Sequence, residues 1–265
     1  LEGVTSVIHT AARVHVMNEG AVDALDQFLR VNRDGTRHLA ECAAQRGVQR
    51  LVFVSSIKVN GESTGDVPFR ADDAPAPVDP YGISKWEAEQ ALWRVAQSTP
   101  LEVVAVRPPL VYGPGAGGNV LRLLNLLRAG APLPLASVRN RRSIVYVDNL
   151  ASALIACASH PRAAGNTYLV SDGDDLSTPE LITELAAGMG CRARLLPLPA
   201  PLLTLAGVFT GKSAEIGRLT GSLTVDSSGL CTSLGWTPPY NARSALRQTG
   251  LWFASHAPRL GGGGR

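Results

Sequence analysis

Short apolar runs alternate along the chain with longer stretches in which apolar residues recur on one helical face. Runs of this length with little polar alternation are typical of parallel strands that are covered on both faces. We predict strands at residues 4–8, 50–56, 101–107, 144–147 and 168–170. We predict helices at residues 21–47, 81–97, 120–129, 148–158 and 241–255. The alternation through residue 160 predicts an α/β fold with a parallel sheet.

Two helix boundaries carry clear sequence signals. Gly47 is suited to follow the first long helix, because glycine tolerates the left-handed backbone that often ends a helix. The stretch Ser177-Thr-Pro-Glu180 is similar to a capping box, in which two polar side chains satisfy free backbone groups at a helix start. After Pro161 the pattern changes to prolines and shorter helices, so we expect a second unit to begin nearby.

The composition indicates a globular protein and excludes several classes of function. Of the 265 residues, 45% are hydrophobic and 18% are charged, which is enough apolar content for a sizeable core. The net charge of +3 is too small to argue for a nucleic-acid partner. The four cysteines are far apart and form no C-x-x-C motif, which favours reduced thiols in a cytoplasmic protein over disulfides or a zinc site. The most apolar segment, residues 195–209, is interrupted by prolines, so a buried or lid-like helix is favoured over membrane contact.

The stretch Asp79-Pro-Tyr-Gly-Ile-Ser-Lys85 contains the strongest candidate chemistry. Tyr81 and Lys85 are four residues apart and share one face of a helix. Asp79 is a good N-cap and Pro80 a good first helical residue, which places Tyr81 near the positive end of the helix dipole. A neighbouring cation and a helix N-terminus both lower the pKa of a phenol, so we predict a proton-transfer group that works near neutral pH. A surface helix that carries this spacing by chance is the alternative.

Small and polar residues stand where two other predicted elements could meet a ligand. His9-Thr-Ala-Ala12 follows the first strand, and small residues at the carboxyl end of a strand let a ligand approach the backbone. Plain packing of small residues is the alternative. Asn32 is a polar residue on an otherwise apolar helical face, and is interpreted either as a satisfied core amide or as a clamp for a ligand or the backbone.

Short motifs follow one another in a characteristic order along the chain. They are His9-Thr-Ala-Ala12, Val31-Asn32 with Gly35-Thr36, Val52-Phe-Val-Ser-Ser56 with Gly61, Pro80-Tyr-Gly-Ile-Ser-Lys85, Arg107-Pro-Pro-Leu-Val-Tyr-Gly-Pro114 and Leu234-Gly-Trp236. With these motifs the sequence resembles the extended short-chain dehydrogenase/reductase family, in its NAD-dependent epimerase/dehydratase branch, and within that branch the bacterial UDP-sugar 4-epimerases. The match covers nearly the whole chain, so it is far more specific than any single motif.

The resemblance implies roles for particular residues. Tyr81 would be the catalytic acid/base, Lys85 would hold the nicotinamide ribose and lower the pKa of Tyr81, and Ser56 would complete the catalytic set. The cofactor-binding positions that it implies are Thr10, Ala11, Ala12, Asn32, Tyr81, Lys85 and Pro108. The substrate-binding positions that it implies are Ser56, Asn119 and Arg142. A guanidinium at this last position suits a diphosphate, because it pairs bidentately with phosphate; a solvated loop is the alternative for the basic residues 139–142.

The resemblance also implies the domain organisation. Residues 1–165 would form a Rossmann-like parallel sheet with an excursion near residues 113–140 to the substrate side, and residues 166–265 mainly a smaller substrate-binding domain. The first strand, glycine-rich turn and first helix of the family are not in the sequence, so we expect an amino-terminally truncated chain. The residue that selects the cofactor in the family belongs to that segment, so NAD is expected and NADP stays open. The cysteine pattern favours a cytoplasmic protein. A homodimer is expected, because relatives dimerise through helices that match residues 35–44 and 81–94.

The function implied is a nucleotide-sugar 4-epimerase that acts on a UDP-hexose through a 4-keto intermediate with bound NAD. One alternative is an NAD(P)-dependent nucleotide-sugar ketoreductase or 4,6-dehydratase. Dehydratases of the family place an Asp-Glu pair just after the catalytic hydroxyl, whereas Ile57 and Lys58 follow Ser56 here. Lys58 also stands where many epimerases have a small or hydroxyl residue, and Leu110 where many relatives have Asn. A truncated, non-catalytic fragment is a further alternative.

Overall fold

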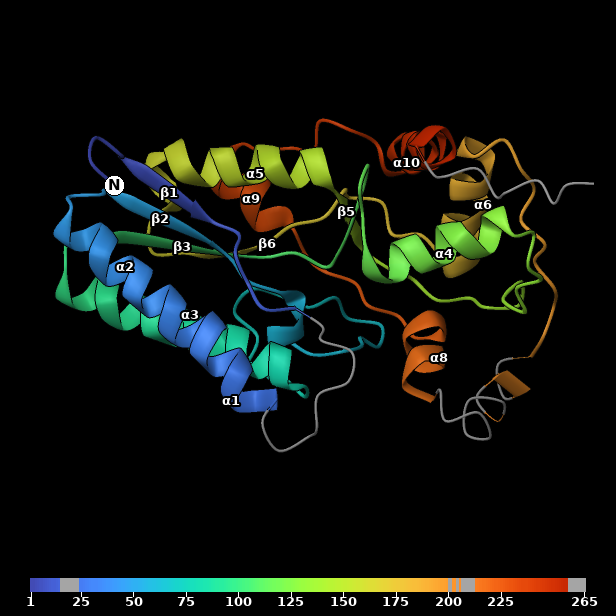
Figure 1. Cartoon of the computed structure of the whole chain (residues 1–265), viewed down its shortest axis with the longest axis horizontal. Coiled ribbons are helices and arrows are strands. Elements are labelled where there is room, and N and C mark those ends of the chain that lie inside the picture. Colours follow the sequence, from blue (N-terminus) through green and yellow to red (C-terminus); the bar gives the residue numbers. More distant parts are fainter. Residues whose placement is uncertain (15–23, 200–201, 204, 206–212, 257–265) are drawn as a thin grey trace, which may run out of the picture.

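The computed structural model describes residues 1–14, 24–199, 202–203, 205 and 213–256. Its central sheet contains β1 (Ser6–His9), β2 (Arg50–Val54), β3 (Glu102–Arg107) and β6 (Thr167–Leu169), all parallel in the order β1-β2-β3-β6 (Figure 1). The middle strands are buried on both faces because their residues are almost all apolar. The predicted α/β fold with a parallel sheet is confirmed.

One face of the sheet is covered by α2 (Gly35–Gln45) and α3 (Pro80–Ser98), which lie side by side (Figure 1). Their apolar sides pack on the strands in a cluster that includes Leu51, Phe53 and Leu92. The predicted helix 21–47 is interrupted: α1 (Ala24–Phe28) joins α2 through a π-helical turn at Leu29–Asp34. The predicted stop at Gly47 is confirmed, since this residue has a φ of 72°.

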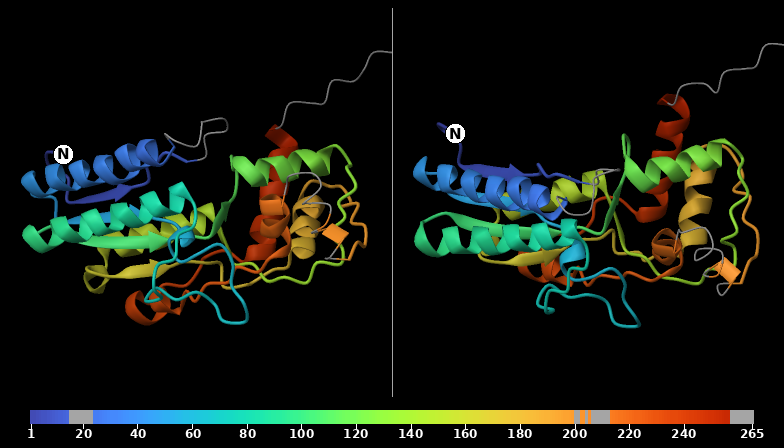
Figure 2. Two further views of the ribbon diagram at one scale, coloured as in Figure 1. Left: turned by 90° about the horizontal axis from the view of Figure 1, so that it is seen from below. Right: turned by 60° about the horizontal axis from the view of Figure 1, so that its bottom comes forward.

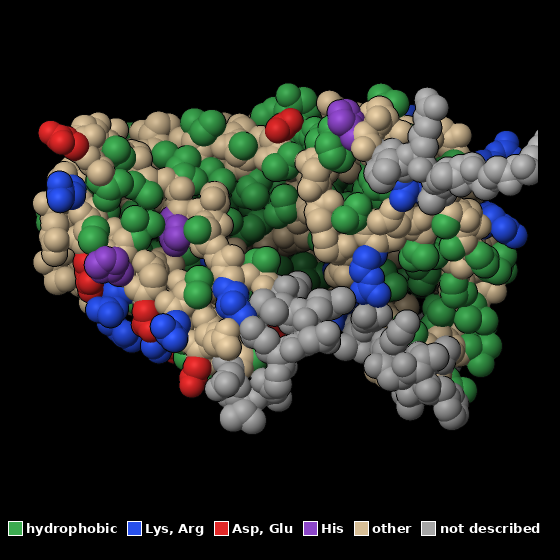
Figure 3. All heavy atoms as spheres, in the orientation of Figure 1, with side chains coloured by type: hydrophobic (Ala, Val, Ile, Leu, Met, Phe, Trp, Pro, Cys, Tyr) green, Lys and Arg blue, Asp and Glu red, His purple; other side chains and the backbone are tan. Residues whose placement is uncertain are grey.

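The opposite face is covered by α5 (Val147–Ser159) and α9 (Ser228–Leu234), with a 3₁₀ turn at Pro161–Ala163 between α5 and β6. Figure 1 shows the sheet between these helices and the α2–α3 pair. At the β1 edge, Ile8 and the α5 residues Val147 and Ile155 are exposed, and Figure 3 shows hydrophobic side chains gathered over this part of the surface.

A second group of elements lies beyond the carboxyl ends of the strands (Figures 1 and 2). It contains the short parallel pair β4 (Leu110–Tyr112) and β5 (Ile144–Tyr146) with α4 (Gly118–Arg128), α6 (Thr178–Gly188), α8 (Ser213–Thr220) and α10 (Ala242–His256). The capping box at Ser177 and Glu180 is confirmed at the start of α6. Gly188 and Gly250 let α6 and α10 approach closely, because a Cβ at either residue would meet backbone atoms at 2.0–2.2 Å.

The chain passes between the two groups of elements more than once. β6 and α9 follow residue 165 in the sequence but pack on the sheet, so the predicted boundary there does not separate the two groups cleanly. The exit after β3 contains the short strand β4. The apolar segment 195–209 lies partly outside the described residues, which include 195–199, 202–203 and 205 of it. None of the described helices combines the length and hydrophobicity needed to cross a bilayer.

The connection between β2 and α3 forms a long loop that projects from the sheet in Figure 2. Its backbone pairs with the segment that precedes α9: Thr64 N donates to Ser222 O at 2.9 Å, and Phe69 N donates to Thr224 O at 2.9 Å. The loop is therefore held at two points against residues 222–224 before it returns to the start of α3.

Candidate active site

Ser56 lies at the carboxyl end of β2, where the strand passes into the 3₁₀ turn Ile57–Val59. It is the N-cap of that turn, and its Oγ accepts a hydrogen bond from Lys58 N at 3.3 Å. The next backbone amide, Ile57 N, donates to Pro108 O at 3.0 Å, which ties the turn to the end of β3. Ser56 is buried, and the turn that it begins is tied to the ends of two adjacent strands.

Tyr81 occupies the first turn of α3, as predicted. The Asp79 side chain caps this helix by accepting a hydrogen bond from Gly82 N at 2.7 Å, and Pro80 is the first helical residue. The Tyr81 ring meets Phe28 edge-on, with the ring centroids 6.2 Å apart. The Ser56 hydroxyl lies close enough to the Tyr81 phenol to act on its pKa. Two residues that are far apart in the sequence thus form one pair of hydroxyls.

The electrostatics of Tyr81 differ from the prediction. Burial raises the pKa of the phenol above its ordinary value, the hydrogen bond from Ser56 opposes this, and the Asp79 carboxylate raises the pKa further. The predicted lowering of this pKa was therefore wrong for the chain itself. Spacing along a helix shows which charges are near, but not the desolvation that accompanies burial.

Lys85 is almost completely buried, with 1% of its surface exposed, and its Nζ lies 4.0 Å from the centre of the Phe53 ring. Burial lowers its pKa from 10.5 to about 7, an effect that the nearby Glu89 carboxylate partly offsets. The pKa of His9 is lowered by burial and then by the charge of Lys85. Lys85 therefore changes its charge near neutral pH, in the interior beside β1 and β2.

A buried ion pair that the sequence analysis did not identify lies behind these residues. The Arg107 guanidinium donates to both carboxylate oxygens of Glu89, at 2.9 and 2.7 Å, and also to Asn60 Oδ1 at 2.9 Å. The Ser55 hydroxyl donates to the same Glu89 carboxylate. Glu89 follows Lys85 by one helical turn, and Arg107 ends a strand. The sequence signal for this network was Arg107, a charged residue at the end of the apolar run 103–106.

Three of the residues predicted to line a cofactor follow the carboxyl end of β1, and a fourth, Pro108, is buried directly after β3. Thr10 and Ala11 are exposed and Ala12 is half-buried. Asn32 is buried in the π-helical turn: its Oδ1 accepts from Arg13 N at 2.7 Å, and its Nδ2 donates to Arg13 O at 3.0 Å and to Ser84 Oγ at 2.9 Å. Asn32 is thus a satisfied buried amide that also clamps the backbone of Arg13, whereas contact with a cofactor stays a prediction.

The residues predicted to bind substrate come from the second group of elements. Asn119 is exposed in the first turn of α4. Arg142 is half-buried, and its guanidinium donates to Arg218 O at 2.6 Å and to Gly221 O at 3.1 Å, at the end of α8. Burial lowers the pKa of Arg142, and Glu62 opposes that effect. The alternative of a fully solvated basic loop is therefore wrong for this residue.

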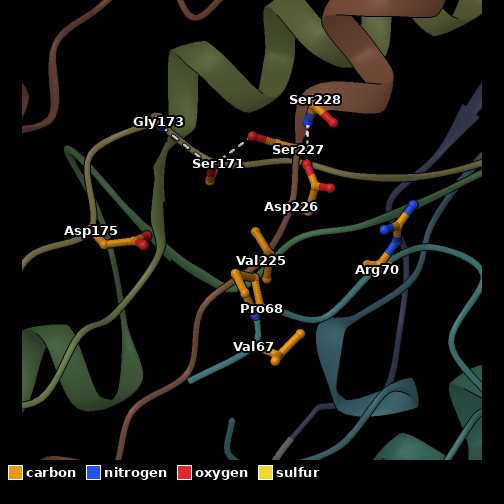
Figure 4. A pocket seen from close by; sticks show the side chains of 10 residues that line it. All are labelled: Val67, Pro68, Arg70, Ser171, Gly173, Asp175, Val225, Asp226, Ser227 and Ser228. Atoms are coloured by element: carbon orange, nitrogen blue, oxygen red, sulfur yellow. Dashed lines mark hydrogen bonds between the residues drawn. The ribbon is translucent and has the colours of Figure 1, made fainter. Parts of the chain in front are cut away.

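A separate cavity of about 500 Å³ opens elsewhere on the surface. Figure 4 shows its lining, in which the Ser171 and Ser227 hydroxyls hydrogen bond each other at 2.9 Å and Arg70 lies at one side. Asp175 and Asp226 also line it. None of the predicted site residues lines this cavity, so it is distinct from the Ser56–Tyr81 pair.

Comparison with known proteins identifies the family. A family model described as the NAD dependent epimerase/dehydratase family matches residues 1–171. A UDP-glucose 4-epimerase of Vibrio cholerae is 44% identical over 255 residues, which cover 96% of this chain and 78% of that protein. The chain belongs to the NAD dependent epimerase/dehydratase family. The family that the sequence motifs predicted is therefore confirmed.

Two further known proteins are similar to this chain. A 2-alkyl-3-oxoalkanoate reductase of Stenotrophomonas maltophilia is 32% identical over 196 residues, covering 71% of this chain and 58% of that protein. Among solved structures, the UDP-glucuronic acid 4-epimerase of Bacillus cereus in complex with NAD has a TM-score of 0.76 at 19% identity, covering 96% of this chain and 75% of that one. This likeness shows the shared fold.

Proposed function

We propose that the chain carries the catalytic machinery of a nucleotide-sugar 4-epimerase that acts on a UDP-hexose with bound NAD. The observation that carries the proposal is that the Tyr81 phenol lies beside the Ser56 hydroxyl at the carboxyl end of the sheet, on the same helix as the buried Lys85. Ligands of open α/β sheets bind at this end of the strands. The 44% identity to the Vibrio cholerae UDP-glucose 4-epimerase supports the substrate class.

The residues at the end of β1 fit the nicotinamide side of the cofactor. Thr10 and Ala11 are small and exposed, so a ligand could approach their backbone, and Lys85 lies on the neighbouring helix. Thr10, Ala11, Ala12, Tyr81, Lys85 and Pro108 would hold it, with Asn32 supporting the loop. When bound, NAD accepts a hydride from the sugar and later returns it.

Tyr81 would move the proton of the reaction. It would accept the proton of the sugar 4-hydroxyl as the hydride leaves C4, and return that proton after the 4-keto sugar has presented its other face. The Ser56 hydroxyl would hydrogen bond the reacting oxygen. Because burial raises the pKa of Tyr81 in the chain alone, the phenol is neutral near pH 7 and must lose its own proton before it can accept that of the sugar 4-hydroxyl.

Asn119 and Arg142 would bind the diphosphate side of the substrate. Arg142 is supported by its position: its guanidinium is anchored at the end of α8 by two backbone carbonyls. Such anchoring fixes the direction of the remaining donors, which suits a bidentate contact with phosphate. Glu62 lies near enough to raise the pKa of Arg142, so it also belongs to the surroundings of this contact.

The proposed protein is a cytoplasmic homodimer. The four cysteines are free thiols, which suits a reducing compartment. The helices expected at the dimer interface, α2 and α3, lie side by side on one face of the sheet. Sedimentation of the purified protein tests the oligomeric state.

The experiment that tests the function is incubation of the protein with UDP-glucose and a catalytic amount of NAD. We expect UDP-galactose to form with no net change in the nicotinamide redox state, because the hydride returns to the same substrate. An absence of interconversion for all UDP-hexoses tried would contradict the proposal.

A ketoreductase is the second candidate function. It is supported by the 32% identity to the 2-alkyl-3-oxoalkanoate reductase, and by a Tyr81 phenol that is neutral near pH 7 and would donate a proton to a carbonyl oxygen. Stoichiometric consumption of NADPH or NADH with a keto-sugar substrate would identify this activity. A 4,6-dehydratase is disfavoured, because Ile57 and Lys58 replace the carboxylate pair that elimination requires.

A further inference from the structure

Lys58 connects the two elements that carry the candidate catalytic hydroxyls. It lies in the 3₁₀ turn that begins after Ser56, and its ammonium forms an ion pair with the Asp79 carboxylate that caps α3. The ammonium also contacts Glu62 Oε1 at 2.8 Å. The side chains of Lys58 and Asp79 are 18% and 30% exposed, so the pair is shielded from water more than most surface ion pairs.

The backbone of Lys58 contributes to the same connection. Its amide donates to Ser56 Oγ at 3.3 Å. Its carbonyl oxygen lies where a Cβ on Gly82 would be only 2.9 Å away, so the turn packs directly against the first turn of α3. The Asp79 carboxylate reaches Lys58 with one oxygen and Gly82 N with the other.

We propose that Lys58 is a positioning residue, which holds the Ser56 turn against the start of α3 through Asp79 and thereby sets the approach of Ser56 to Tyr81. The inference rests on the proposed function, because it assigns the reaction to these two hydroxyls. The sequence contained the clue that Lys58 departs from the residue type found in many epimerases, but the partner of the ammonium was not evident from spacing.

A double-mutant cycle on kcat and on stability tests the proposal. Lys58→Met removes the ammonium, and Asp79→Asn removes the charge of its partner while keeping a good N-cap. We expect either change to lower kcat by roughly 10- to 100-fold with little change in KM, because a small misplacement of reacting groups is enough for such a loss. The double variant should be no slower than either single variant, since the two side chains act as one unit.

Two further variants separate positioning from general damage. Lys58→Arg keeps a cation on a long side chain and should retain kcat within about threefold of the parent, as expected for rescue of a charge pair. Arg243→Met removes an exposed ion pair with Glu180, between α10 and α6, and should leave kcat unchanged. Urea unfolding of every variant measures the Lys58–Asp79 coupling without reference to activity.

The outcomes distinguish this proposal from the proposed function. If the parent protein is active and the unfolding cycle shows coupling, but Lys58→Met and Asp79→Asn keep the parental kcat, the positioning role is overturned. The same conclusion follows if the two kcat effects simply multiply in the double variant. If instead the parent interconverts no nucleotide sugar and reduces no keto sugar, the function itself fails, whatever the unfolding cycle shows.

Discussion

At the scale of single residues, the chemistry depends on how burial changes ordinary side chains. Tyr81 is a neutral phenol whose pKa is raised by burial, and Lys85 is an amine whose pKa is lowered to about 7 by the same cause. Both shifts favour the uncharged form, as desolvation does. In the chain alone the two groups therefore do not form a permanent phenolate–ammonium pair.

The lowered pKa of Lys85 predicts a stability difference that depends on pH. An amine with a lower pKa in the folded than in the unfolded state destabilises the fold fully below about pH 7, and the cost disappears as the pH rises toward 10.5. Lys85→Met should therefore be more stable than the parent at acidic pH. That advantage should shrink by roughly 1.4 kcal/mol per pH unit above neutrality. Urea unfolding at a series of pH values measures it, and an advantage that does not vary with pH would refute the lowered pKa.

The residue types and spacing of the candidate site could be predicted from the sequence, whereas the contacts between distant residues could not. Helix periodicity places Tyr81 and Lys85 on one face, and the Asp79 cap and Pro80 follow from local preferences. The partner of Lys58 and the pairing of Glu89 with Arg107 depend on how β2, β3 and α3 pack. No local pattern contains that information.

At the scale of elements, the π-helical turn at Leu29–Asp34 is the feature that joins the segment after β1 to α3. It places Asn32 inside the protein, where the amide clamps the backbone of Arg13 and donates to Ser84. The Ser84 hydroxyl in turn donates to Tyr81 O at 2.8 Å. The sequence predicted one continuous helix here, because an extra residue in a helical turn hardly disturbs the apolar period.

The clamp at Asn32 predicts a specific sensitivity. Asn32→Asp keeps the shape of the side chain but loses both amide donors and buries a carboxylate beside the Arg13 carbonyl. We expect the free energy of unfolding to fall by about 2–4 kcal/mol, measured by chemical denaturation. Ser84→Ala removes only one partner and should cost about 1 kcal/mol. Equal and small losses for both variants would show that the clamp contributes little.

At the scale of the whole molecule, a buried carboxylate connects the sheet to the second group of elements. Asp172 accepts hydrogen bonds from Tyr146 N at 2.8 Å, from Asn149 Nδ2 at 2.7 Å and from the Tyr112 hydroxyl at 2.7 Å. The Tyr112 hydroxyl also lies 3.1 Å from Ala242 O at the start of α10. The alternation of strands and helices predicted the sheet, but this junction needs residues from four separate segments and left no local pattern.

The hydrogen bonds of Asp172 predict that the Tyr112 hydroxyl stabilises the fold as a whole. Tyr112→Phe leaves a buried carboxylate oxygen without its donor, so the free energy of unfolding should fall by about 1–3 kcal/mol. Tyr240→Phe is the matched control: that residue is 44% exposed, and its hydroxyl should contribute less than about 0.5 kcal/mol. Equal effects of the two substitutions in urea unfolding would argue against the junction.

The proton-transfer role of Tyr81 is the centre of this account, and a single-turnover experiment on Tyr81→Phe tests it most directly. The protein is loaded with NAD and mixed with UDP-glucose, and the appearance of reduced nicotinamide is followed by absorbance. Because a phenylalanine cannot accept the 4-hydroxyl proton, we predict that hydride transfer slows by roughly 10²- to 10⁴-fold, while the affinity for UDP-glucose is retained. Hydride transfer at the parental rate in Tyr81→Phe would contradict the account.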